Sequence, residues 1–307
     1  MRRVAVVDLG SNSLKLLVAE GPPLAEVARA RAEVRIFPSQ GAALSADAIL
    51  AAVDSVEQLV ARARAAGAER VLVLGTSALR EAPNRALLAA ALRDRVGLDL
   101  SVISGETEAR LGVDGILADP ALAAVRGCVA FDLGGGSMQL MRVVELRCVH
   151  ARSLPLGAVR MTRGFLGDLA KPIDPHDLES LRHHALELIQ PHLPAGAARE
   201  APLVGAGGAL AAVADLMQAD GEPVSGGRVG VLALRNWLSR LAALDLAGRK
   251  AVPGMPEGRA DILPAALVVL LALADHAGAE TLQLTHNGVR HGMAQLLLGD
   301  AGDLLTA

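Results

Sequence analysis

Two short segments combine a carboxylate with a run of small residues in the same order. Residues 4–13 read Val-Ala-Val-Val-Asp-Leu-Gly-Ser-Asn-Ser, and residues 129–137 read Val-Ala-Phe-Asp-Leu-Gly-Gly-Gly-Ser. In each copy an apolar strand would end at an aspartate, Asp8 or Asp132, and a turn would follow whose small residues let backbone N–H groups approach an anion. A single turn of this kind is typical of a tight hairpin. Two matched copies instead favour a pair of turns that face each other and hold a phosphate chain.

The residue types in these turns suit phosphate and a divalent cation. The aspartates Asp8 and Asp132 would serve as direct or water-mediated ligands of Mg²⁺ or another divalent cation. A third glycine-rich turn, with Gly207 and Gly208, follows a short apolar run. This turn either contacts phosphate or simply connects a strand to a helix, and the sequence does not decide between the two interpretations. Neither the Rossmann G-x-G-x-x-G spacing nor a Walker A motif occurs in the chain. The predicted phosphate-binding residues in the first two turns are Ser11, Asn12, Ser13, Gly134, Gly135, Gly136 and Ser137.

The elements that would position these turns alternate between strands and helices, which predicts an α/β fold. Strand-like runs lie at residues 3–7, 14–19, 71–74, 98–103, 127–131, 139–144, 147–153, 202–204 and 281–284. Helical patterns begin after Ser45, at about 85, at about 104, at 263 and at 289. The two copies of the aspartate turn lie about one domain apart in sequence. We therefore expect an N-terminal domain at 1–125, completed by a returning helix at about 289–307, and a second domain at 126–288 with a helical insertion.

Composition excludes several classes of partner. The chain has 307 residues, a length that suits two domains. Its formal net charge of −3 provides no overall electrostatic attraction to nucleic acid or anionic lipid. The apolar stretch at 263–274 is shorter than the roughly 20 residues that cross a bilayer. The opening Met-Arg-Arg leads directly into a strand, and the cysteines Cys128 and Cys148 are expected as small core residues. These features predict a cytoplasmic protein that binds neither nucleic acid nor membrane.

Seven blocks along the chain carry a resemblance to a known family. The sequence resembles the short form of the exopolyphosphatase/guanosine pentaphosphate phosphatase (Ppx/GppA) family, within the actin-like ATPase (ASKHA) superfamily. The resemblance implies two actin-like (ribonuclease H-like) domains flanking an interdomain cleft, where water attacks a terminal phosphoryl group held by backbone amides, an arginine and magnesium. The matching blocks are residues 8–13, 75–80, 103–110, 132–137, 153–160, 259–264 and 288–292. From the length of the sequence, we expect the chain to lack the additional helical domain of the family's long members.

The resemblance also assigns roles to individual residues. The family's catalytic glutamate, which directly precedes Ala-Arg, matches Glu108, with Glu106 as the alternative if the local register differs. A carboxylate there can orient water and accept its proton, although a charge at a helix start is the simpler interpretation. Arg80 matches the family's phosphate-contacting arginine, and its guanidinium fork suits phosphate oxygens. The alternative for Arg80 is a salt bridge, for example to Glu81.

The chain also departs from the family pattern. Gln139 stands where the family has a glutamate that it associates with the metal and phosphate site. Glutamine keeps the size but brings no charge to hold a cation, so we expect slow or altered catalysis. Thr107 replaces a common glutamate, and residues 285–287 read Thr-His-Asn instead of Ser-Asp-Tyr.

The leading functional prediction is an exopolyphosphatase that releases terminal phosphate from inorganic polyphosphate. Guanosine pentaphosphate (pppGpp) 5′-phosphohydrolase activity is the nearest alternative, because these motifs do not separate the two substrates. A kinase of the same superfamily is a third hypothesis, although the chain has no tyrosine that could help to form an aromatic sugar-binding surface. Gln139 motivates a fourth, a weakly active or non-catalytic sensor of polyphosphate or an alarmone. A homodimer is one assembly that the sequence allows.

Overall fold

The computed structural model describes residues 2–36, 42–222 and 224–299. The chain divides into two compact units. Unit 1 contains the chain up to Ala123 and again from Asn287 onward, whereas unit 2 runs from Ala124 to His286. The boundaries predicted from the sequence lie after residues 125 and 288. Each unit is described by itself below.

Unit 1 is built on a mixed five-stranded sheet in the order β3-β2-β1-β4-β5. Its strands are β1 (Arg3–Leu9), β2 (Leu14–Glu20), β3 (Ala25–Ala32), β4 (Arg70–Gly75) and β5 (Leu100–Val102). Its helices are α1 (Ala46–Ala65), α2 (Ser77–Glu81), α3 (Arg85–Val96), α4 (Gly105–Leu117) and α11 (Val289–Leu298). The first three strands pair antiparallel, while β1, β4 and β5 run parallel.

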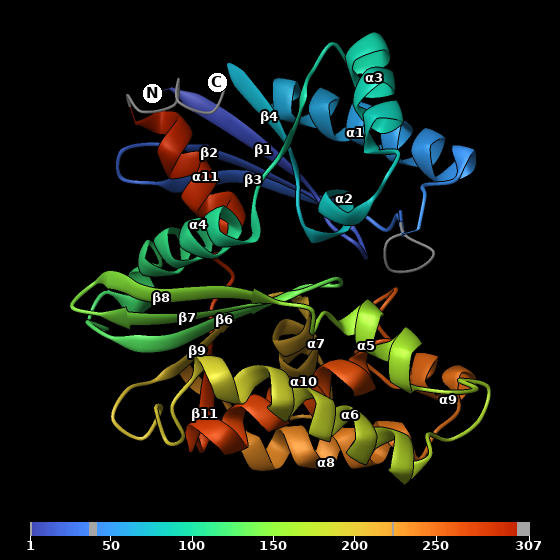
Figure 1. Cartoon of the computed structure of the whole chain (residues 1–307). Coiled ribbons are helices and arrows are strands. Elements are labelled where there is room, and N and C mark those ends of the chain that lie inside the picture. The colour runs from blue at the N-terminus through green and yellow to red at the C-terminus, as the bar shows by residue number, and fades with distance from the viewer. Residues whose placement is uncertain (1, 37–41, 223, 300–307) are drawn as a thin grey trace. The chain divides into compact units, whose positions relative to one another are not determined.

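Both faces of β1 are covered, which explains its continuous apolar sequence. Successive side chains of a strand point to opposite faces. Ala5 and Val7 therefore belong to the core that contains the buried residues of α1 and α3, while Val4 and Val6 belong to the core that contains Met293 of α11. Figure 1 shows α11 beside α4, although all of unit 2 separates these helices in the sequence. The last helix thus supplies one wall of the first unit.

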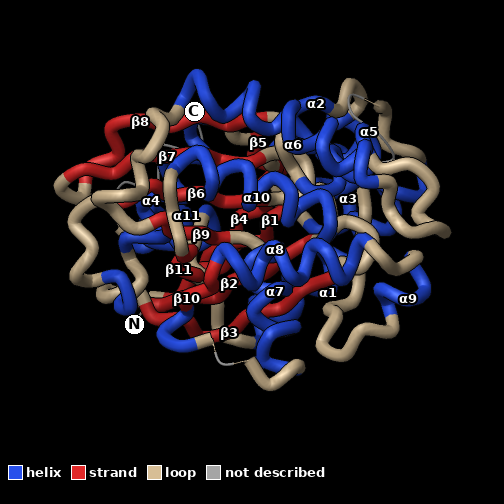
Figure 2. The backbone as a smooth tube through the Cα atoms, turned by 90° about the horizontal axis from the view of Figure 1, so that it is seen from below, coloured by secondary structure: helices blue, strands red, loops and turns tan. Residues whose placement is uncertain are grey.

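Unit 2 contains a six-stranded sheet in the order β10-β11-β9-β6-β7-β8, which can be followed in Figure 2. Its strands are β6 (Cys128–Leu133), β7 (Met138–Val144), β8 (Arg147–Leu154), β9 (Leu203–Ala206), β10 (Arg228–Gly230) and β11 (Thr281–Leu284). Its helices are α5 (Ala158–Phe165), α6 (Pro175–Ile189), α7 (Gly208–Ala219), α8 (Val231–Ala242), α9 (Leu246–Lys250) and α10 (Leu263–Ala277). Helix α10 is buried along most of its length and packs against α5, α6 and α8 (Figure 1).

The two sheets repeat one arrangement. In unit 2, β6, β7 and β8 form an antiparallel series, and β9 and β11 continue parallel to β6, as β4 and β5 do beside β1. Strand β10 is an addition at the edge of the second sheet. The predicted α/β class with a duplicated strand–turn–strand unit is therefore confirmed. Among the described residues, no helix is long and apolar enough to cross a membrane.

Some details differ from the sequence predictions. Strands β3 and β10 were not predicted, and β5 is shorter than the predicted run at 98–103. The prediction that both cysteines are core residues is wrong for Cys148, which lies exposed on β8, whereas Cys128 is buried. Burial raises the pKa of the Cys128 thiol to about 11. The exposed cysteine lies near the start of the edge strand of its sheet, between Arg147 and Val149, which are exposed as well.

Candidate active site

The first group of predicted site residues lies at one edge of the unit 1 sheet. Leu9 pairs with Gly75 in β4, and Gly75 pairs with Val102 in β5. Because these three strands are parallel, their carboxyl ends meet at the same edge, and the loops that follow them begin side by side. The Ile103 N–H donates to the Gly75 carbonyl at 3.1 Å and extends this alignment past the end of β5. The fold therefore brings together the Asp8 turn, the segment leading to Arg80 and the start of α4.

The first turn is compact and largely buried. Ser11, Asn12 and Ser13 are each less than a tenth exposed, and Asp8 is half-buried at the end of β1. A Cβ added to Gly10 would lie 3.1 Å from the Ser13 carbonyl oxygen, so the turn closes tightly there. The three polar residues belong to a close-packed structure and not to a solvated loop tip. Whether they contact phosphate stays a prediction.

Arg80 and Glu108 form an ion pair at this edge. Arg80 Nη1 donates to Glu108 Oε2 at 2.6 Å and to the Ile103 carbonyl oxygen at 3.1 Å. The Glu108 side chain is 8% exposed and that of Arg80 is 22% exposed, so little water screens the pair. Twenty-eight residues of sequence separate the two partners. The salt bridge considered for Arg80 is thus made to Glu108, so the predicted phosphate-binding arginine and the predicted catalytic glutamate are in direct contact.

The start of α4 separates the two candidate glutamates. Ser104 caps the helix, with its Oγ accepting from the Thr107 N–H at 3.1 Å. Glu108 then points into the protein, while the Glu106 side chain is 63% exposed and pairs with Arg110 at 2.9 Å. Glu106 forms a surface i,i+4 ion pair with Arg110, and such a pair contributes little to stability. Burial and the contact with Arg80 favour Glu108 over Glu106 as the reactive carboxylate.

Helix α11 holds α4 through close contact between backbones. A Cβ on Gly292 would overlap the Leu111 carbonyl group, and one on Gly115 would overlap the Gly288 carbonyl group. Glycine at these crossing points lets the helices approach more closely than any larger residue would. Since Glu108 lies on α4, the position of its carboxylate depends on this packing.

His291 also anchors the start of α11. Its Nδ1 accepts from the Gly288 N–H at 3.3 Å, and its Nε2 lies 3.7 Å from Glu26 Oε2. Burial, followed by the charge of Arg290, lowers the pKa of His291 to about 4. The imidazole is therefore neutral at physiological pH, with Nδ1 acting as an acceptor.

In unit 2 the second turn rests on the start of α5. The carbonyl of Gly134 accepts from Ala158 N–H at 2.9 Å, and the carbonyl of Gly136 accepts from Arg160 Nε at 2.7 Å. The Gly135 carbonyl accepts from two further amides of the same helix. A Cβ on Gly157 would collide with the turn, so this glycine permits the contact. The carbonyl oxygens of the turn are thus engaged by α5.

Gln139 and two serines form a hydrogen-bonded group beneath this turn. Gln139 is 2% exposed, and its Nε2 donates to Ser137 Oγ at 2.9 Å and to Ser153 Oγ at 3.3 Å. In the register of the sheet, Gln139 stands opposite Asp132 on β6 and opposite Ser153 on β8. The amide is therefore part of the support for the turn.

The third glycine-rich turn joins β9 to α7 and packs against the second. Gly207 has φ +100°, and a Cβ there would lie 2.9 Å from Asp132 Oδ1. The guanidinium of Arg259 would overlap a Cβ on Gly208. The positive φ of Gly207 and the close packing around Gly207 and Gly208 explain why both positions are glycine. The geometry is that of a strand-to-helix turn beside Asp132. Contact of Gly207 and Gly208 with phosphate stays a prediction.

The donor set fits magnesium that arrives with a phosphate. Mg²⁺ keeps several waters and is usually bound through one or two carboxylates together with substrate phosphates. Unit 1 offers Asp8 and unit 2 offers Asp132, each at the end of a strand and beside a turn of small residues. Within the described ranges, no group of three or more His, Cys, Asp or Glu side chains is placed to hold a metal. Each aspartate is, in its own unit, the kind of ligand that a phosphate-bound Mg²⁺ takes, and magnesium binding by either one stays a prediction.

Sequence reasoning missed several residues that the structure places at these turns. Arg160 and Ser153 belong to a block that was recognised, but they received no role there. Lys15 stands opposite Asp8 in the register of β1 and β2. The alternation of a strand would have revealed the Lys15 position, because residues equally spaced from a hairpin turn face each other. No signal in the sequence pointed to the Arg160 contact with a carbonyl.

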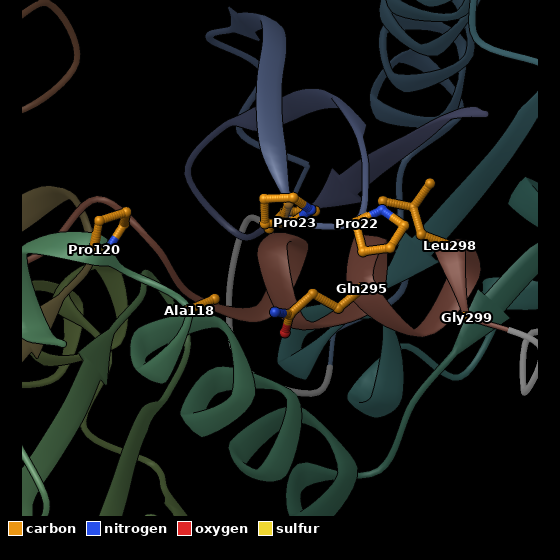
Figure 3. Close-up of a pocket in the computed structure, with 8 residues that line it drawn as sticks. Pro22, Pro23, Ala118, Pro120, Gln295, Leu298 and Gly299 are labelled. Carbon is orange, nitrogen blue, oxygen red and sulfur yellow. The ribbon is translucent and has the colours of Figure 1, made fainter. Parts of the chain in front are cut away.

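An open groove lies elsewhere on unit 1, with a volume of about 480 Å³. Figure 3 shows Gln295 on α11, with Ala118 and Pro120 on one side and Pro22 and Pro23 on the other. Its lining residues include neither the aspartate turn nor Arg80 and Glu108. The groove is therefore separate from the candidate active site.

The chain is similar to known proteins along nearly its whole length. The model of the Ppx/GppA phosphatase family matches residues 4–300. Exopolyphosphatase 2 of Mycobacterium tuberculosis is 30% identical, with 97% of this chain and 99% of that protein covered. Exopolyphosphatase 1 of the same organism is 29% identical over 54% of this chain and 49% of that protein.

Solved structures show the same fold at lower identity. The crystal structure of an exopolyphosphatase from Cytophaga hutchinsonii has a TM-score of 0.85 at 20% identity, covering 97% of this chain and 98% of that one. The Aquifex aeolicus PPX-GPPA enzyme has a TM-score of 0.77 at 20% identity, covering 100% and 99%. With the family model spanning nearly its whole length, the chain belongs to the Ppx/GppA phosphatase family and is a phosphoanhydride hydrolase.

Proposed function

We propose that this chain is an exopolyphosphatase that releases terminal phosphate from inorganic polyphosphate. Membership of the phosphatase family supports the reaction class, and the names of the relatives support the substrate. The observation that carries the assignment of residues is the buried Arg80–Glu108 pair, with 2.6 Å between Nη1 and Oε2, at the sheet edge where the Asp8 turn also begins. The carboxylate can orient water and accept its proton, and the guanidinium can bind phosphoryl oxygens.

In the proposed reaction, Glu108 acts as general base. Its Oε2 accepts from Arg80, and we assign the attacking water to this carboxylate. The water oxygen forms a bond to the terminal phosphorus as its proton passes to the carboxylate, and the bridging P–O bond breaks. Orthophosphate is released, and the shortened chain leaves with the bonding electron pair. A positioned carboxylate base contributes typically about 10²- to 10⁴-fold to such a rate.

The other residues bind charge. Arg80 donates to Glu108 and to the Ile103 carbonyl through Nη1. We assign its Nη2 and Nε to phosphoryl oxygens, which suit the guanidinium fork. The backbone N–H groups and hydroxyls of residues 11–13 and 134–137 would bind further phosphoryl oxygens. Asp8 and Asp132 would hold magnesium, which neutralises charge on the phosphates when it is bound.

The test compares two glutamates of one helix. Phosphate release from polyphosphate and from pppGpp is measured with Mg²⁺ for the wild type, Glu108→Gln and Glu106→Gln. We expect the wild type to release phosphate faster from polyphosphate than from pppGpp. Glu108→Gln should lose about 10²- to 10⁴-fold in kcat, and the exposed control Glu106→Gln should change kcat by less than about twofold. Full activity of Glu108→Gln would exclude it as the base, and no release from either substrate would contradict the hydrolase assignment.

Other outcomes distinguish the alternative functions. Faster release from pppGpp would identify a guanosine pentaphosphate 5′-phosphohydrolase. Tight binding of polyphosphate or pppGpp with negligible turnover would identify a sensor, the alternative that the neutral Gln139 favours. Transfer of phosphate to an acceptor instead of water would identify a kinase.

A further inference from the structure

The residues beneath the second turn form a row across three strands. Asp132 on β6, Gln139 on β7 and Ser153 on β8 are directly opposite one another in the sheet register. Residues paired in this way point to the same face, with Cβ atoms about 5 Å apart. Gln139 stands in the middle of this row and is almost completely buried, at 2% exposure. Its side chain can therefore act only on its immediate neighbours.

The amide of Gln139 determines the direction of two hydroxyl groups. A carboxamide NH₂ has two hydrogens, and here one goes to Ser137 Oγ at 2.9 Å and the other to Ser153 Oγ at 3.3 Å. Each serine oxygen is thereby an acceptor from Gln139, so each hydroxyl directs its own proton away from the glutamine. For Ser137, the last residue of the second turn, that proton is available to an acceptor at the turn.

The neighbouring carbonyls of the turn are already engaged. Those of Gly134, Gly135 and Gly136 accept from the backbone of α5 or from Arg160, and the Ser137 carbonyl accepts from the Gly134 N–H at 3.0 Å. An incoming anionic oxygen is the acceptor that best matches an oriented hydroxyl in this setting.

We propose that Gln139 is a positioning residue that fixes the Ser137 hydroxyl as a hydrogen-bond donor to phosphoryl oxygens at the second turn. The proposal rests on the proposed phosphate-binding role of that turn. It gives Gln139 a function that its lack of charge makes possible, because a carboxylate accepts hydrogen bonds only and would draw the Ser137 proton to itself.

A glutamate at this position would also change the charge of the row. Its carboxylate would stand directly opposite that of Asp132, and like charges in such a pair repel each other unless a cation lies between them. With Gln139 the row carries the Asp132 carboxylate and a neutral amide. Anion binding at the second turn should therefore depend less on a divalent cation in this chain than in a Gln139→Glu variant.

The experiment measures binding and not turnover. The dissociation constant for inorganic tripolyphosphate is determined by calorimetry, in excess EDTA and in Mg²⁺, for the wild type, Gln139→Met, Ser137→Ala and the double variant. Ser153→Ala serves as the matched control, because it removes the other hydroxyl and leaves the Ser137 contact in place. Circular dichroism verifies that each variant is folded.

We expect Ser137→Ala to weaken tripolyphosphate binding roughly 10-fold or more, as for loss of a hydrogen bond to a charged group. Gln139→Met should weaken it about 5- to 10-fold, and the double variant should bind no more weakly than Ser137→Ala alone. Ser153→Ala should change affinity less than about threefold. In EDTA, Gln139→Glu should bind tripolyphosphate about 10-fold more weakly than the wild type. In Mg²⁺ its affinity should recover, so the ratio of its dissociation constants in EDTA and in Mg²⁺ should be larger than that of the wild type.

Several results would overturn the proposal. Wild-type affinity in Gln139→Met, or losses that multiply in the double variant, would show that Gln139 does not act through Ser137. Equal dependence on Mg²⁺ in the wild type and Gln139→Glu would refute the charge argument. If tripolyphosphate binds with the expected pattern but polyphosphate is not hydrolysed, the inference stands and the proposed function fails. Absence of any tripolyphosphate binding would overturn both.

Discussion

Removing Arg80 should destabilise the protein because it leaves a buried carboxylate behind. The Arg80→Met substitution keeps an unbranched side chain but deletes the guanidinium that lies 2.6 Å from Glu108 Oε2. Exposed ion pairs contribute about 0–1 kcal/mol, whereas removing one partner of a buried pair costs about 3–5 kcal/mol. With side-chain exposures of 22% for Arg80 and 8% for Glu108, this pair lies close to the buried case. We expect a loss of about 3 kcal/mol in the free energy of unfolding.

The second half of this prediction is a rescue. Glu108→Gln removes the buried charge, so the double variant Arg80→Met/Glu108→Gln should recover to within about 1–2 kcal/mol of the wild type. Urea denaturation followed by far-UV circular dichroism gives the free energies of the wild type, both single variants and the double variant. If the double variant is as unstable as Arg80→Met, the cost does not arise from the Glu108 carboxylate that has lost its arginine, and the prediction is refuted.

Three further predictions concern packing, pH and thiol reactivity. Gly292→Ala should lower both the urea midpoint and kcat, because its Cβ would displace α4 and with it the carboxylate of Glu108, the proposed base. Gly164→Ala in α5, where a Cβ meets nothing within 4 Å, should leave the midpoint unchanged or slightly raised. An equal response of the two variants would contradict this account of the helix crossing. The pKa of His291 is lowered from 6.5 to about 4, so its contribution to stability is complete above pH 6.5 and is lost as the pH falls toward 4, by at most about 3 kcal/mol. His291→Gln should reduce the difference between urea midpoints measured at pH 7.5 and pH 4.5, and an unchanged difference would rule out this histidine as its source. A thiol reagent should label the exposed Cys148 in the native protein and the buried Cys128 only after denaturation, as counted by mass spectrometry.

The duplicated sheet was predictable because its signal is local. Apolar strands, their aspartates and the following small residues are contiguous in sequence, and the same order appears twice. Strand β3 was missed because, apart from Val27, it consists of Ala, Arg and Glu and contains no apolar run. Its place in the sheet comes from pairing with β2, whose sequence does contain an apolar run.

The contacts within the candidate site were harder to predict. The residue types of Arg80 and Glu108 indicated their chemistry, but their ion pair exists because parallel pairing of β4 and β5 aligns two distant loops. Gln139 shows the same limit. Its sequence position indicated a missing charge, whereas its role depends on cross-strand neighbours that only the register of β7 defines. Side-chain function here follows from which strands pair, and that is set by the whole sheet.

The place of α11 in unit 1 has a consequence for how the protein is made. A ribosome synthesises β1 first and must complete all of unit 2 before residues 289–298 emerge. Until then, the face of β1 formed by Val4 and Val6 lacks its covering helix, although the rest of the sheet can already pair. The later unit can therefore fold before the earlier one is finished, which reverses the N-terminal-first order usual for chains of several domains. A nascent chain released before α11 is translated would expose this apolar surface and would become a substrate for chaperones or proteases.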